Sequence, residues 1–107
     1  MTMFITITTR FAAYHRWPAA PDAVEFLRSR HRHVFHVKAT KQVFHDDRDI
    51  EFILFKGEVD EWIQATLEGE DTSTWSCERW AVEMIQRFEL SECEVSEDGE
   101  NGAKVIA

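Results

Sequence analysis

The chain has 107 residues, a formal net charge of −8, 44% apolar residues and 30% charged residues. These values are typical of one soluble globular domain, spanning residues 1–107, with a single modest core. The acidic balance argues against nucleic-acid binding, which requires a basic patch. No stretch approaches the roughly 20 apolar residues of a membrane span, so we expect no membrane partner.

The N-terminal residues lack the charged-then-apolar layout of a secretion signal, so we expect a cytoplasmic protein. The two cysteines, Cys77 and Cys93, form no C-x-x-C pair. They predict no disulfide framework, as is usual in a reducing compartment.

The first half of the sequence predicts two strands. Residues 3–13 and 32–44 are rich in β-branched and aromatic side chains with partial alternation, which indicates strands. Prolines punctuate the connection at 17–21, and residues 22–30 predict a short helical turn. The polar residues 45–49 end the second strand.

The middle of the chain predicts two helices. Residues 50–66 carry apolar side chains at spacings of three and four, which places them on one helical face: Phe52, Phe55, Val59, Trp62 and Ile63. Residues 68–72 predict a loop, after which Thr74 or Ser76 is a suitable N-cap. The apolar stripe of the second helix consists of Trp80, Ala81, Met84, Ile85 and Phe88.

Residues 92–97 and 103–106 predict two final strands, joined by a loop at 98–102 that contains the turn dipeptides Asp-Gly and Asn-Gly. The element order is therefore strand, strand, helix, helix, strand, strand. This order predicts an α+β fold in which a four-stranded antiparallel sheet carries both helices on one face. A sheet this small keeps exposed edges unless another chain covers them, so we expect a homo-oligomer.

Three histidines lie where the first two predicted strands end and begin. His31 and His33 alternate onto one face of a strand, about 6 to 7 Å apart, which suits two ligands of one metal ion. His15 ends the preceding strand, so antiparallel pairing would bring it beside them. Three histidines with an open fourth position are typical of a catalytic zinc site, although histidines of an ordinary polar surface would give the same spacing. We do not expect His36, on the opposite strand face, or His45, in a loop, to be ligands.

Five short motifs follow one another over nearly the whole chain. They read FAAYHRW from Phe11, HRH from His31, IEFILFK from Ile50, SCERWA from Ser76 and VSE from Val95. In order, they resemble the F-x-A-A-H-R-L, H-G-H, V-x-D-F-x-x-L-K, P-T-S-E-x-L-A and V-x-E-T motifs of the 6-pyruvoyl-tetrahydropterin and 6-carboxy-tetrahydropterin synthase family.

The resemblance implies the ββααββ tunnelling fold of that family, which agrees with the element order derived from the residues. It assigns the zinc ligands to His15, His31 and His33. It also assigns Glu97 to the carboxylate that binds the edge of a pterin or purine-like ring, where two oxygens accept two parallel N–H bonds. The family further implies trimers or pairs of trimers with ligand pockets between chains.

The catalytic residues of the family do not carry over. Its reactive cysteine, four residues before H-G-H, corresponds to Leu27, which cannot transfer a proton. Its Asp-His pair corresponds best to Leu67–Gly69, and the chain has no histidine after His45. Arg32 and Trp75 also replace the glycine of H-G-H and the proline that opens the second helix. We therefore assign no catalytic residue.

Three functions remain open. The first is a divergent member of the family that binds zinc and a pterin or purine-like ligand without the usual reaction. The second is an active zinc-dependent lyase that uses another acid or base, such as Cys77 at a helix N-terminus or one of the acids Glu68, Glu70 and Asp71. The third is a structural oligomer. A buried structural role is the favoured interpretation of Cys77, because the sequence gives no reason to place it near the zinc.

Overall fold

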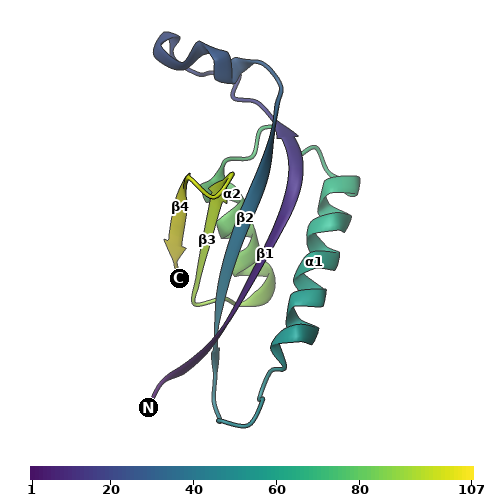
Figure 1. Cartoon of the computed structure of the whole chain (residues 1–107), viewed down its shortest axis with the longest axis vertical. Helices are drawn as coiled ribbons and strands as arrows, with labels where there is room; N and C mark the ends of the chain where they lie inside the picture. Colours follow the sequence, from purple (N-terminus) through teal and green to yellow (C-terminus); the bar gives the residue numbers. More distant parts are fainter.

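The computed structural model describes residues 1–107 and contains one antiparallel sheet in the order β1-β2-β3-β4 (Figure 1). The strands are β1 (Met3–His15), β2 (His31–Val43), β3 (Glu92–Glu97) and β4 (Asn101–Ile106). The helices are α1 (Phe52–Gly69), α2 (Cys77–Phe88) and the short 3₁₀ helix η1 (Asp22–Arg28). The predicted α+β fold and its ββααββ order are confirmed. None of the helices is both long and apolar enough to cross a membrane.

Both main helices pack on the same face of the sheet. Along β1 and β2 the odd-numbered side chains point toward the helices, and the buried ones include Ile7, Phe11, Phe35 and Val37. These side chains join one core cluster with the buried faces of α1 and α2. Strict alternation over two long paired strands therefore gives the sheet one apolar face, which the helices cover.

Helix α2 carries the sharper amphipathic pattern. Ser76 is its N-cap, which is one of the two residues predicted for this position. The Ser76 side chain accepts a hydrogen bond from the Arg79 N–H at 3.0 Å. Trp80, at 1% exposure, is the largest fully buried side chain and contacts the rings of Phe11, Trp62 and Trp75.

Some element boundaries differ from the prediction. Helix α1 continues to Gly69, so residues 68–69 are helical and the loop before α2 is shorter than expected. Strand β4 begins at Asn101 rather than residue 103, because Asn101 pairs with Glu97. The next residue must be glycine, since a Cβ on Gly102 would lie 2.2 Å from the Val95 carbonyl oxygen.

The helix-covered face of the sheet changes character at one end. Beyond Phe11 and Phe35 the same face of β1 and β2 carries His15, His31 and His33, which are only partly covered. In Figure 1 this end lies at the top, where β1 passes into the connection that contains η1. The fold therefore sets polar nitrogen ligands directly against the end of an apolar core.

Candidate metal centre

The register of β1 against β2 brings the three predicted histidines together. His15 pairs directly with His31, and Ala13 pairs with His33, so all three imidazoles lie on one face. Their ligand nitrogens all lie within 4.8 Å of one another. The prediction that these three histidines converge is confirmed. Whether they hold zinc stays a prediction.

Oxygen acceptors orient two of the rings. The Nδ1 of His31 lies 2.7 Å from the Ser29 carbonyl oxygen, and the Nδ1 of His33 lies 2.6 Å from Asp98 Oδ2. A carbonyl and an ionised carboxylate only accept, so each Nδ1 is the protonated donor. In the neutral ring this leaves a lone pair on Nε2, which is the tautomer that a metal ligand requires.

The opposite nitrogens lack partners. The Nε2 atoms of His15, His31 and His33 are all buried and make no hydrogen bond. Leaving one such polar atom buried and unsatisfied costs about 1–3 kcal/mol, and three in a single cluster call for a physical cause. A metal ion bound by all three nitrogens satisfies them at once, so this donor set fits zinc.

Burial also affects the charge of the first histidine. It lowers the pKa of His15, and the neighbouring His31 and His33 lower it further, against the opposing effect of the Glu97 carboxylate and the Trp75 backbone. The neutral form of His15, which a metal requires, is therefore favoured.

Glu97 lies against the histidines. It is the last residue of β3, opposite Phe35 of β2. Its Oε1 is 3.3 Å from His15 Nε2, and its Oε2 is 3.3 Å from His33 Nε2, although neither pair is aligned as a hydrogen bond. The structure thus gathers all four residues that the sequence assigns to the site.

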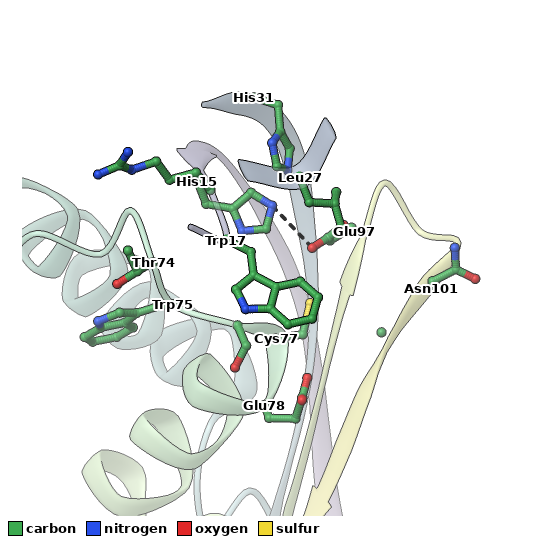
Figure 2. Close-up of a pocket in the computed structure, with 13 residues that line it drawn as sticks. His15, Trp17, Leu27, His31, Thr74, Trp75, Cys77, Glu78, Glu97 and Asn101 are labelled. Carbon is green, nitrogen blue, oxygen red and sulfur yellow. Dashed lines mark ion pairs between the residues drawn. The ribbon is translucent and has the colours of Figure 1, made fainter. Parts of the chain in front are cut away.

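A cavity of about 440 Å³ opens beside the centre (Figure 2). This volume lies in the range of small-molecule sites. Its lining comes from the end of β1, the connection that contains η1, the start of β2, the segment leading into α2 with its first residues, and the last hairpin: His15, Arg16, Trp17, Leu27, His31, Thr74, Trp75, Ser76, Cys77, Glu78, Glu97, Asn101 and Gly102. A ligand in this cavity would contact Glu97 and the imidazoles of His15 and His31.

The positions at which the resemblance expects catalytic residues do not all lie at the cavity. Leu27 lines the cavity, so an apolar side chain occupies the place that the resemblance gives to a reactive thiol. Leu67–Gly69 forms the end of α1 and contributes nothing to the cavity lining. His36 lies on the opposite face of the sheet beside Gly99, and His45 pairs with Asp49, so neither joins the centre.

Cys77 lies closer to the centre than the sequence suggested. It is buried, as expected, but it also lines the cavity together with His15 and Glu97 (Figure 2). Burial, followed by the Glu97 and Glu78 carboxylates, raises the pKa of the Cys77 thiol to about 11, although it begins helix α2. At neutral pH the side chain is therefore a protonated thiol and not a nucleophile.

Sequence reasoning missed Asp98 as a member of the site. Asp98 has a φ of 56° at the turn after β3, and its Oδ1 accepts the Val34 N–H at 2.9 Å while Oδ2 accepts from His33. These bonds hold the pKa of Asp98 below its usual value, the Val34 N–H having the largest effect. The only signal in the sequence was an Asp-Gly turn directly after Glu97, which indicates a turn and says nothing of its reach to His33.

Comparisons with known proteins give no further assignment. No family model matches the chain, and no curated protein matches it. The geometry of the site and the motif resemblance are therefore the grounds for a functional proposal.

Proposed function

We propose that this chain is a divergent relative of the tetrahydropterin synthases that binds zinc and a pterin or purine-like ligand. The carrying observation is the convergence of three buried imidazole nitrogens without hydrogen-bond partners beside a ligand-sized cavity. His15, His31 and His33 would hold the metal, and Ser29 and Asp98 would orient two of the rings. Zinc bound there supplies a Lewis acid that polarises an oxygen of the ligand.

The ring-binding part of the proposal depends on Glu97. Its carboxylate lines the cavity, and about a third of the side chain is exposed, so a ligand can reach it. Two carboxylate oxygens match the paired N–H groups along the edge of a pterin or guanine ring. The aromatic side chain of Trp17 lines the same cavity and offers an apolar surface to a flat ring.

The cavity supports binding better than the synthase reaction. General acid–base catalysis requires a group that exchanges protons near neutral pH. Leu27 carries none, and the raised pKa of Cys77 removes its thiolate at neutral pH.

A zinc-dependent lyase is the second candidate, because Cys77 and Glu78 both line the cavity. Its test is incubation with dihydroneopterin triphosphate, where we expect neither the pyruvoyl nor the carboxy product. Clear turnover would favour the lyase over a binding function.

Assembly with further copies of the chain is part of the proposal. Strands β1 and β4 are the two edges of the sheet, and no other strand of the chain covers their outer sides. Open edges of this kind favour pairing with another chain, and the motif resemblance implies trimers or hexamers. The third candidate, a purely structural oligomer, lacks an explanation for the clustered imidazoles.

Elemental analysis of the purified chain tests the metal site. We expect close to one zinc ion per chain, because the three nitrogens form one donor set. The matched control is His36→Ala, which changes a histidine on the opposite face of the sheet and should leave the zinc content unchanged. A folded chain that takes up no zinc would overturn the proposal.

Titration with a pterin, followed by ring fluorescence, tests the ligand. We expect saturable binding that Glu97→Ala weakens, because the paired hydrogen bonds to the ring edge are lost. Glu94→Ala, an exposed acid on the same strand, should bind like the unchanged protein. Equal affinity of the Glu97 variant and the unchanged protein would show that Glu97 does not hold the ring.

A further inference from the structure

Both carboxylate oxygens of Glu97 face nitrogens of the candidate metal centre. The distances are 3.3 Å from Oε1 to His15 Nε2 and 3.3 Å from Oε2 to His33 Nε2. Neither contact has hydrogen-bond geometry, and both nitrogens remain without hydrogen-bond partners. The contacts are therefore not hydrogen bonds, and they are ion pairs only if the imidazoles are protonated.

The distances agree with shared coordination of one ion. Two ligand atoms that each lie about 2.0–2.1 Å from a zinc ion at the tetrahedral angle are about 3.3–3.4 Å apart, and each oxygen of Glu97 has this spacing to one histidine nitrogen. The chemistry agrees as well, because the Nδ1 of His33 donates to Asp98 and its Nε2 therefore carries a lone pair in the neutral ring. A lone pair and a carboxylate oxygen repel each other unless a cation lies between them.

We infer that Glu97 is a fourth ligand of the metal ion that His15, His31 and His33 hold, an inference that rests on the proposed zinc site. With four protein ligands the centre is closed, as in structural zinc sites, and offers no free position to a ligand oxygen. A ring that engages both oxygens of Glu97 must first release the carboxylate from the metal. Ring binding then replaces the contact between Glu97 and the metal with a contact between Glu97 and the ring, and this opens a position on the metal.

The hairpin of β3 and β4 positions this carboxylate beside the histidines. Glu97 ends β3 in register with Phe35, one residue before the turn. The next residue, Asp98, hydrogen-bonds to both the Val34 N–H and His33, which fastens the turn to the strand that carries the ligands. The backbone of Glu97 is thereby fixed while its side chain, 31% exposed, retains room to swing into the cavity.

Metal titration of the full chain tests the fourth ligand. The metal-free protein is titrated with Zn²⁺ against a chromophoric chelator, alongside Glu97→Ala, the nearly isosteric Glu97→Gln and the surface control Glu94→Gln. We expect Glu97→Ala to weaken zinc binding by at least about tenfold, the smallest loss usual for groups that support a metal site. Glu97→Gln controls for a folding defect, because glutamine has nearly the same shape as glutamate. This variant should also bind zinc more weakly than the unchanged protein. Equal zinc affinity of both Glu97 variants and the unchanged protein would overturn the inference.

Azide binding to the Co²⁺-loaded chain tests whether the centre is closed. We expect azide to leave the visible spectrum of the unchanged protein and of Glu94→Gln unaltered, and to shift the spectrum of Glu97→Ala, which has an open position. An azide-induced shift in the unchanged protein would overturn the inference while leaving the three-histidine site standing. Failure of the unchanged protein to bind Co²⁺ or Zn²⁺ would instead overturn the proposed function itself.

Discussion

Two stretches of one sheet face show how the same backbone serves packing and chemistry. Along β2, Phe35, Val37 and Ala39 are buried under the helices, whereas His33 and His31, next on the same face, are only partly covered. The strand pairing is continuous across the boundary. The difference therefore comes from the helices, which cover one stretch and leave the other beside a cavity. The rigid paired strands of the core thus position the metal-ligating histidines, which lie next to the core on the same sheet face.

The largest expected effect lies in the packed stretch. Trp80→Ala should lower the free energy of unfolding by about 3–5 kcal/mol, because it removes the largest fully buried side chain and leaves a cavity. Denaturant unfolding measures the change. The matched control is Trp17→Ala, since Trp17 is 50% exposed at the histidine end and should change stability by only about 0.5 kcal/mol. Similar losses for the two variants would contradict the division between the stretches.

The histidine stretch should respond to metal and not to packing. Zinc at about 100 times its dissociation constant should stabilise the unchanged protein by about 2.7 kcal/mol, and His33→Ala should lose most of this gain. Thermal unfolding with and without added Zn²⁺ measures the effect. Without metal, the variant should lose only about 1–2 kcal/mol, because it gives up the hydrogen bond between His33 Nδ1 and Asp98 while the Nε2 of His33 has no partner to lose. A large loss of stability in the metal-free variant would show that His33 is mainly a packing residue.

The smallest effect concerns the two buried thiols, of which Cys77 lines the cavity and Cys93 does not. Burial raises the pKa of Cys93 to about 12 and that of Cys77, which lines the cavity, to about 11. Alkylation requires the thiolate, so both should react slowly at pH 8 and about tenfold faster for each pH unit up to 10. Cys77 should react about tenfold faster than Cys93, as peptide mass spectrometry of the metal-free protein can show. Equal rates, or a plateau near pH 9, would contradict the different burial of the two sites.

The sequence predicted the fold well because the core is periodic. Alternation in β1 and β2 and the stripe of α2 each indicate one buried face, and those faces fit together in only a few ways. The three histidines followed from the same alternation, since His31 and His33 share a face and His15 ends the neighbouring strand. Glu97 required the motif resemblance, because the pairing of β3 with β2 is not visible in local spacing.

The remaining contacts of the site were beyond such reasoning. The reach of Asp98 to His33 depends on the φ of a single turn residue, and Ser29 contributes only a carbonyl oxygen that any residue would have. The presence of Cys77 in the cavity depends on where α2 begins relative to the sheet. Each of these contacts depends on tertiary positions within a few ångströms, which neither hydrophobic periodicity nor residue propensity predicts.

The connection between His15 and His31 has a consequence for how this centre tolerates change. It spans residues 16–30, too long a loop to dictate strand register by its own geometry. Register must come from the buried pairs farther along, such as Phe11 with Phe35, and a slip by one residue would turn His15 to the other face. A change in the length of this connection should therefore leave the strand register intact, while conservative changes deep in the core put the alignment of the imidazoles at risk.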